Sequence, residues 1–275
     1  MKFRIALASM LVLGGLAGCA GDGPPTSATP EAPAPADTGP ISLIGLWTVA
    51  DAGEEAGTVL RIAPKKQLSL WRTCGALTGS WAAAQDLFLG EVNGGGETCQ
   101  PVQNPSWLRD ATGYQSVGDA RVLVDRNGKQ LARLVPGGKP KVGSGVDPAE
   151  AAPPVITDED RAELTRTPQV PATLTRVEPK LIVGRWVPVA AAGPAYAEFK
   201  DDSTWTGSDG CNGNGGRWTA TASSMLATAG PSTLMACDGA PVPTWLTSTA
   251  AAGLADGVLV LLDPTGAEVA RLKKG

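Results

Sequence analysis

The sequence of 275 residues contains no histidine. Without an imidazole, the chain cannot use Ser-His-Asp or Cys-His catalysis, bind a metal through histidine, or sense pH through that side chain. Aromatic residues are also scarce, at 5%, although eight of them are tryptophan. Hydrophobic residues still make up 43%, enough for a buried core. The composition therefore excludes two common catalytic classes and permits folded domains.

Long apolar runs are absent after the first eighteen residues. Lys2 and Arg4 flank the start of an apolar run that ends at Gly18. Its fourteen residues, 5–18, would rise about 21 Å as a helix, which is short of the roughly 30 Å hydrocarbon core of a bilayer. This pattern predicts a secretory signal rather than a membrane span.

The residues Leu16, Ala17, Gly18 and Cys19 resemble a bacterial lipobox. Residues 1–18 are then a lipoprotein signal peptide and Cys19 is acylated; an ordinary signal peptide with a chance cysteine is the alternative. Two or more acyl chains hold a protein stably at a bilayer. We expect the mature chain to bind the lipid bilayer through acylated Cys19, at the extracytoplasmic face of the cell membrane. If the source has two membranes, Ala20 favours the outer one.

The charge of the chain is mildly negative. The formal net charge is −4, and removal of Lys2 and Arg4 with the signal peptide makes it more negative. No basic stripe exists to neutralise phosphates, so nucleic acid is not an expected partner. The partner expected instead is an unknown envelope protein or wall component.

Two stretches are rich in proline and poor in bulky apolar residues. Residues 19–40 are expected to form the lipidated cysteine and a disordered tether. Residues 137–180 contain further prolines and are expected to form a linker between domains. Inside this linker, Thr157 and Asp160 have the spacing of a capping box and predict a short helix within 157–166.

An internal repeat flanks the linker and divides the chain into domains at 41–136 and 181–275. Five rare residues recur in order at offsets of 137 to 139 residues, and all eight tryptophans fall within the repeats. The matched pairs are Trp47 with Trp186, Cys74 with Cys211, Trp81 with Trp218, Cys99 with Cys237, and Trp107 with Trp245. The sequence therefore predicts two copies of one domain.

Each copy has the pattern of short strands with one helix. Residues 258–262 and 267–272 predict a hairpin around Asp263–Gly266, and the first copy repeats it around Asp125–Gly128. Ser106 or Thr244 is expected to cap the helix that precedes each hairpin. The predicted fold class is α+β: two small antiparallel-sheet domains, each a half-barrel with one covering helix, joined by the proline-rich linker.

Four cysteines remain once Cys19 is assigned to the lipid. Four cysteines allow three connectivities, and the duplication selects Cys74 with Cys99 and Cys211 with Cys237. In an oxidising compartment, each disulfide would stabilise its domain by roughly 3 kcal/mol. A zinc site with four thiolates would need CxxC-like clusters, and these are missing.

The second copy resembles a known family. Phe199-x-x-Asp202, Gly210-Cys211-Asn212 and Thr233-x-Met235-Ala236-Cys237 occur in that order and are similar to the META domain, the family of bacterial heat-inducible lipoprotein-like (HslJ-like) proteins. The resemblance covers about residues 181–272; the first copy is degenerate and is assigned by the repeat. It implies an α+β fold with a curved sheet and an envelope setting, sometimes linked to stress. It supplies no catalytic residue, ligand or cofactor.

Three hypotheses for function follow. The first is a non-enzymatic lipoprotein that binds or scaffolds envelope components. The second is a binder of a small apolar ligand or glycan, with Trp205 and Trp71 as exposed ligand contacts. These two tryptophans do not match each other between the copies, because Leu68 aligns with Trp205 when the cysteines are matched. The third, a hydrolase using carboxylates or a lone serine, lacks a recognisable base. The glycine-rich loop 209–215 departs from a calcium loop, so no metal is expected.

Overall fold

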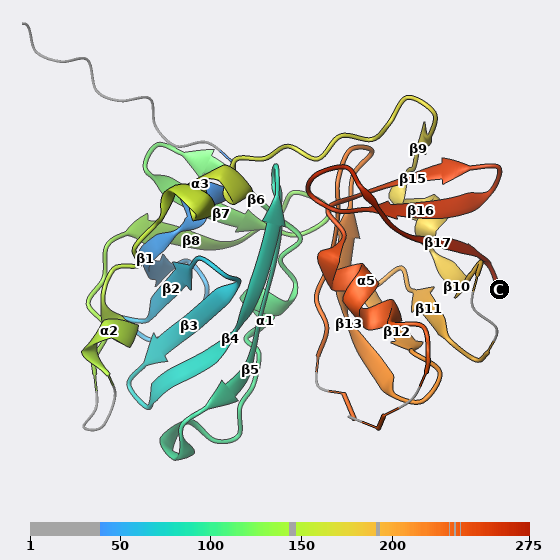
Figure 1. Ribbon diagram of the computed structural model, residues 1–275. Coiled ribbons are helices and arrows are strands. Elements are labelled where there is room, and N and C mark those ends of the chain that lie inside the picture. Colours follow the sequence, from blue (N-terminus) through green and yellow to red (C-terminus); the bar gives the residue numbers. More distant parts are fainter. Residues whose placement is uncertain (1–38, 143–146, 191–192, 231, 234, 237) are drawn as a thin grey trace, which may run out of the picture. The chain divides into compact units, whose positions relative to one another are not determined.

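The computed structural model describes residues 39–142, 147–190, 193–230, 232–233, 235–236 and 238–275. Residues Ala36–Gly275 group into one compact unit. The expected signal peptide (1–18), Cys19 and nearly all of the tether lie outside the described residues. Antiparallel strands dominate the described part, which confirms the expected sheet-rich α+β class (Figure 1).

The first repeat closes into a barrel in which each strand pairs with its neighbour in sequence, and the last pairs with the first. This closure is more complete than the expected half-barrel, because β5 also pairs with β6 at Leu87 and Gly113. The strands are β1 (Gly45–Ala50), β2 (Val59–Ala63), β3 (Gln67–Arg72), β4 (Gly75–Ala84), β5 (Leu87–Gly95), β6 (Gly113–Val117), β7 (Ala120–Val124) and β8 (Gln130–Pro136).

The second repeat, together with β9 from the end of the preceding segment, forms a nine-stranded sheet in the order β14-β13-β12-β11-β10-β17-β16-β15-β9. The strands are β9 (Thr175–Arg176), β10 (Gly184–Pro188), β11 (Tyr196–Phe199), β12 (Thr204–Ser208), β13 (Gly213–Ala220), β14 (Met225–Ala227), β15 (Ala251–Ala255), β16 (Val258–Leu262) and β17 (Glu268–Lys274). β14 is short and meets the start of β15 through the amide of Met225, which donates to the carbonyl of Ala250 at 2.9 Å.

Helices are few and short. The 3-10 helices are η1 (Pro40–Leu43) and η2 (Glu97–Cys99), and the α-helices are α1 (Ser106–Arg109), α2 (Pro148–Ala151), α3 (Asp158–Leu164), α4 (Pro179–Ile182) and α5 (Val242–Ser248). The expected caps Ser106 and Thr244 are wrong. The N-cap residues are Pro105 and Pro241, and neither makes a side-chain cap bond. Proline before or inside the first turn presets the backbone angle, so the helices begin without a hydroxyl cap.

The closing hairpins match their prediction. In both turns, the amide of the fourth residue donates to the carbonyl of the first at 3.0 Å, and the glycine that follows the turn centre has a positive φ: Gly128 at 77° and Gly266 at 84°. Each hairpin also shows a register shift beside the turn. A type I turn followed by a glycine bulge produces this geometry.

The repeats share the bond that anchors their first tryptophan. The Nε1 of Trp47 donates to the carbonyl oxygen of Leu43 at 2.7 Å, and the Nε1 of Trp186 donates to that of Ile182 at 2.6 Å. Both carbonyls belong to the short helix before the first strand of the repeat. The bond ties the helix to the core in each copy.

The second matched tryptophan behaves in the same way. The Nε1 of Trp81 donates to the carbonyl of Ala63 at 2.8 Å, and that of Trp218 donates to the carbonyl of Lys200 at 3.1 Å. Donor and acceptor both shift by the offset of 137 residues found in the sequence. All four indoles are buried in the two main apolar clusters. Repeated tryptophans therefore build the cores, as the repeat predicts.

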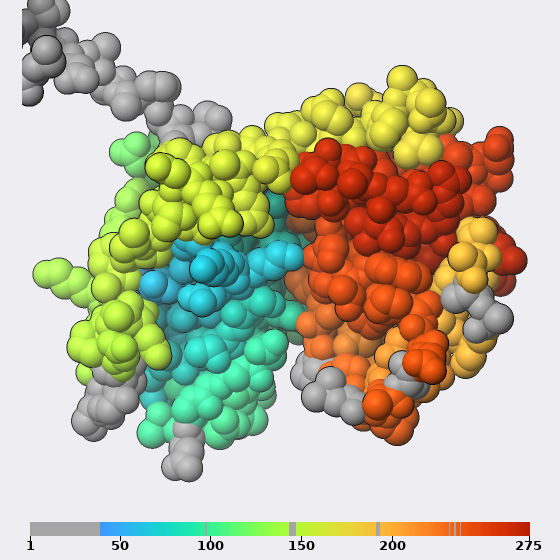
Figure 2. All heavy atoms as spheres, viewed as in Figure 1, coloured from blue at the N-terminus to red at the C-terminus, as the bar shows by residue number. Residues whose placement is uncertain are grey.

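The segment between the repeats lies against both of them. The helix α3 has the predicted capping box between Thr157 and Asp160. The guanidinium of Arg61 on β2 donates to the carbonyl of Ala152 at 2.9 Å. Val177 is buried in the second core, and β9 pairs with β15, which covers an open sheet edge. Figure 2 shows this segment in yellow-green over the strands of the first repeat.

Candidate functional site

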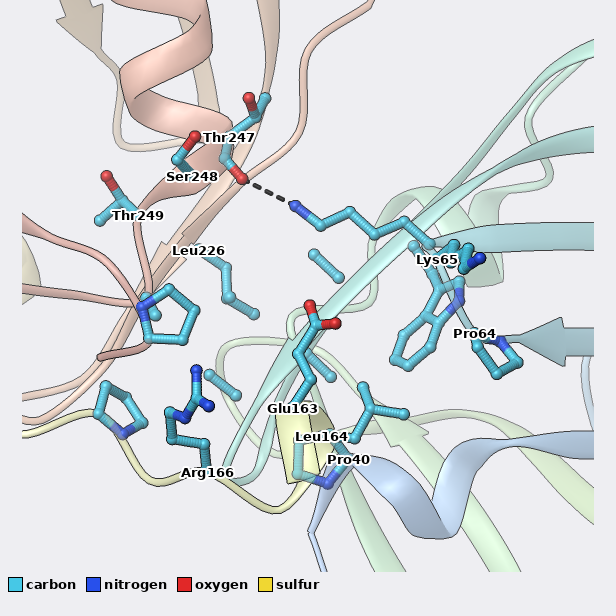
Figure 3. A pocket seen from close by; sticks show the side chains of 18 of the residues that line it. Pro40, Pro64, Lys65, Glu163, Leu164, Arg166, Leu226, Thr247, Ser248 and Thr249 are labelled. Atoms are coloured by element: carbon cyan, nitrogen blue, oxygen red, sulfur yellow. Dashed lines mark hydrogen bonds between the residues drawn. The ribbon is translucent and has the colours of Figure 1, made fainter. Parts of the chain in front are cut away.

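A cavity of about 110 Å³ is lined by residues from both repeats and from α3 (Figure 3). The first repeat contributes the β2–β3 turn, with Lys66, and β4, with Trp81. The helix α3 contributes Glu163, and the second repeat contributes Leu226 and the end of α5 around Thr247. We call this cavity the inter-repeat cleft.

Apolar contacts support the cleft from behind. Leu226 of β14 packs in one buried cluster with Ala84, Leu87 and Leu89 of the first repeat. A hydrogen bond of 2.9 Å from the Ser223 hydroxyl to the Gln85 side chain adds to this contact. The wall of the cleft is therefore made by the packing of the two repeats.

Lys66 connects the first repeat to the end of α5 across the cleft. Its ammonium donates to the carbonyl oxygen of Thr247 at 2.9 Å, the bond drawn in Figure 3. Burial of this ammonium lowers the pKa of Lys66, and the charge of Glu163 opposes that shift. The residue as a whole is exposed because its stem reaches across solvent while its head enters the cleft.

The other charged residues of the cleft differ in how they are used. Asp160 accepts bonds from the amide and hydroxyl of Thr157, so its carboxylate caps α3. Figure 3 shows Glu163 and Arg166 extending into the cavity near Leu226. Within the part of the chain that the structure describes, neither Lys66 nor Arg166 forms an ion pair.

The hydroxyls of the cleft serve the helix α5. The hydroxyls of Thr247 and Ser248 donate to the carbonyl of Thr244 at 3.2 and 2.8 Å, and that of Thr249 donates to the carbonyl of Trp245 at 2.7 Å. Such back-bonding engages the proton that a general base would have to remove. The arrangement suits binding better than nucleophilic chemistry.

The expectation that Trp205 is an exposed ligand contact is wrong. Trp205 is 1% exposed, and its Nε1 donates to the carbonyl of Thr228 at 2.7 Å. It pairs with Phe199 and Gly216, as Leu68 pairs with Ile62 and Gly79 in the first repeat. A Cβ at Gly216 would lie 3.0 Å from the indole nitrogen. The larger ring therefore fills the second core at the position of Leu68.

Trp71 is also buried, at 2%, so its expected exposure is wrong as well. It lies opposite Val59 on the neighbouring strand, and a Cβ at Gly138 would come within 2.9 Å of Val59. The chain leaving the barrel therefore passes beside Val59, the cross-strand neighbour of Trp71. The Nε1 of Trp71 is buried and lacks a hydrogen-bond partner in the described residues.

A half-buried tryptophan lies elsewhere, in the second repeat. Trp107 of the first repeat is 3% exposed, and its Nε1 donates to Glu54 at 2.7 Å; Arg72 holds the same carboxylate at 2.6 Å. Its counterpart Trp245 is only partly buried and lines a groove of about 520 Å³ with Val189, Val269 and Arg271 among others. The loop residues 190–193 are Ala-Ala-Ala-Gly, so the sequence of this loop has no acidic counterpart of Glu54.

The signature residues of the second repeat bind one another. The side chain of Asn212 donates to the carbonyl of Met235 at 2.9 Å and accepts from the amide of Met235 and the hydroxyl of Thr233, both at 2.8 Å. Asp209 accepts from the side-chain amide of Asn212 at 3.0 Å and from the backbone amides of Asn212 and Cys211, and these bonds hold its pKa below the ordinary value. These bonds form a turn that locks two loops together, which accounts for the motif without a metal.

The cysteines follow the predicted pairing where they are described. Cys74 and Cys99 form a disulfide with a Cα–Cα distance of 5.2 Å. Cys211 is disulfide-bonded, and its predicted partner Cys237 lies outside the described residues, as does Cys19. No cluster of three or more metal-ligating residues occurs in the described ranges.

Sequence reasoning missed the cleft because its residues come from three separate segments with no shared motif. For Trp245 a signal existed: Glu54 has no acidic counterpart in residues 190–193. Among the described residues, no helix is long and apolar enough to cross a membrane. No family model matches the chain, and no curated protein matches it.

Proposed function

We propose that this chain is a membrane-anchored extracytoplasmic lipoprotein with two META/HslJ-like sheet domains. The anchor is acylated Cys19, residues 20–40 carry the domains away from the bilayer, and residues 137–180 join them. The protein binds or scaffolds another envelope component, a protein or wall polymer, without catalysing a reaction. A contribution to stress tolerance follows from the resemblance.

The observation that carries this proposal is the set of hydrogen bonds that join Asn212 to Thr233 and Met235, which we call the Asn212 lock. The residues that resemble the family motif engage Thr233 and Met235 and stabilise loops. A motif of this kind suits a binding or scaffolding domain whose surface, rather than whose motif, meets the partner. The hydroxyls at the end of α5 support the same reading, because they donate to carbonyls of their own helix.

The anchor is tested by Cys19→Ala in the full chain. Acylation predicts that the native protein fractionates with membranes and gains the mass of acyl chains, whereas the variant is released from the membrane. The double variant Cys74→Ala/Cys99→Ala is the matched control, because it also removes thiols but leaves Cys19. Equal membrane association of Cys19→Ala and the native chain would contradict the anchor.

The binding role is tested by crosslinking in intact cells. The anchored protein is expected to recover a protein or wall fragment that an unrelated lipoprotein with the same signal peptide does not. Recovery of nothing above that control would contradict a scaffolding role.

A second candidate function is ligand binding at Trp245, and the specific observation is its partly exposed ring in a groove. An indole face with the Glu268–Arg271 ion pair nearby suits a sugar ring, which has an apolar face and a polar rim. Trp245→Ala is expected to abolish retention on wall glycan, and Thr244→Ala, one position earlier on α5, to leave it intact. Equal retention of both variants would contradict this function.

A further inference from the structure

The inter-repeat cleft carries a net positive charge, because three cations and two carboxylates line it. Lys66 and Arg166 both line it, and neither forms an ion pair with a described carboxylate. The nearby carboxylate of Asp160 caps α3 instead. An anion that enters the cleft gains both charge attraction and hydrogen bonds from Lys66 and Arg166.

Lys66 offers two unused hydrogen-bond donors. An ammonium carries three N–H groups, and the structure uses one of them, toward the carbonyl of Thr247 at 2.9 Å. Burial lowers the pKa of this ammonium, although the residue as a whole is exposed. A bound anion would supply the missing partner for the charged form.

Arg166 offers a planar fork. Its guanidinium has five N–H donors, and no described group accepts a hydrogen bond from them. The fork matches the two oxygens of a carboxylate in a bidentate arrangement. Figure 3 shows Arg166 and Glu163 extending into the same space from α3 and the residues just after it.

Charge and size limit the anion. The lining holds three cations, Lys65, Lys66 and Arg166, against two carboxylates, Asp160 and Glu163, and this net charge of one suits a single negative charge rather than a phosphate dianion. The floor is apolar, made by Ala82, Ala83 and Leu226. A volume of about 110 Å³ is smaller than the roughly 150 Å³ cavity that accepts benzene, so the apolar body is short.

We propose that the inter-repeat cleft binds a small organic monocarboxylate, with Lys66 and Arg166 on the carboxylate and β4 and Leu226 on its apolar body. The site goes beyond the proposed function and does not depend on the anchor. Because both repeats and α3 line the cleft, the bound ligand stabilises their packing and raises the Tm by mass action.

The test uses the purified full chain in detergent, with calorimetric titration and thermal unfolding. The probes are butyrate and propionate, whose apolar bodies are short, and the neutral controls are butanol and propanol. Saturable binding and a rise in Tm are expected for the carboxylates alone. Lys66→Gln and Arg166→Gln should each weaken binding at least about tenfold, because each removes a charged partner of the anion. Lys129→Gln, in the β7–β8 turn away from the cleft, should have no effect.

Glu163→Gln provides a test with the opposite sign. It removes the repelling charge without removing side-chain volume, so butyrate should bind several-fold more tightly and inorganic phosphate should begin to bind. The Cys19→Ala variant should bind as the native chain does, which separates this inference from the anchor. Equal binding of alcohols and carboxylates, absence of saturation, or unchanged affinity in Lys66→Gln would overturn the proposal.

Discussion

The two repeats share the hydrogen bonds that fix their buried tryptophans but differ in how a loop covers the third matched tryptophan. Trp47 and Trp186 bond to equivalent carbonyls, as do Trp81 and Trp218. In the first repeat, Glu54 from the loop between β1 and β2 accepts a hydrogen bond from the indole of Trp107, which is buried. In the second repeat, the corresponding loop has no such side chain, and the ring remains partly exposed.

The comparison shows where a duplicated domain can change. The buried indoles and their acceptors stay the same because each loss would leave a buried N–H without a partner. Loops and strand ends differ because solvent can satisfy their polar groups. Function is therefore sought in the differing regions: the surface at Trp245 and the cleft between the repeats.

The largest effect is expected from Trp205, which replaces Leu68 in the second core. Trp205→Ala should lower the free energy of unfolding by about 3–5 kcal/mol, because it leaves a cavity and an unpaired carbonyl at Thr228. Trp205→Leu, which restores the side chain of the first repeat, should cost less. Chemical denaturation measures both. An unchanged midpoint for Trp205→Ala would contradict the packing described for this ring.

The burial of Trp107 beneath Glu54 is tested by Glu54→Ala. The variant removes the acceptor of Trp107 and the partner of Arg72, so a loss of about 1.5–3 kcal/mol is expected. The indole N–H resonance of Trp107 should shift while that of Trp245 stays in place. Glu178→Ala, at an exposed position before α4, is the control and should change stability by less than about 0.5 kcal/mol. A stability change no larger than that of the control would contradict a stabilising contact between Glu54 and Trp107.

The lock of the second repeat is tested by Asn212→Ala. The amide and carbonyl of Met235 lose their partner, so the expected loss is about 1–3 kcal/mol. The first repeat has Gly75 at this position and no such lock. The exposed Asn127→Ala should be nearly neutral. If both variants unfold at the same denaturant concentration, the lock contributes nothing.

The smallest effect concerns Glu91, on the first repeat at its contact with Thr228. Burial raises the pKa of Glu91, so the folded protein holds the proton more tightly than the unfolded chain does. Stability from this group is therefore present below the ordinary pKa and is lost as pH rises through the raised value. Glu91→Gln should remove that loss and raise the Tm more at pH 7 than at pH 4. A larger gain at pH 4 would reverse the assignment.

Local signals predicted the elements that depend on neighbours in sequence. The hairpin turns at Gly128 and Gly266 and the capping box of α3 follow from residue spacing. The matched cysteines predicted the disulfide between Cys74 and Cys99.

Long-range packing was not predictable in the same way. Trp205 and Trp71 were expected at the surface because they break the repeat, but a mismatch in sequence does not tell which side of a strand is covered. A segment more than sixty residues later passes beside Val59, the cross-strand neighbour of Trp71. The cleft likewise needs the contact between β4 and β14, which no motif encodes.

Hydrogen exchange at the indole N–H groups, followed by NMR on the full chain, tests the comparison of the repeats most directly. Among the repeated tryptophans, only Trp245 is expected to exchange fast. Slow exchange is expected for the buried indoles of Trp47, Trp81, Trp107, Trp186, Trp205 and Trp218. Exchange of Trp107 as fast as that of Trp245, or protection of Trp245 equal to that of Trp186, would contradict the difference in burial between Trp107 and Trp245.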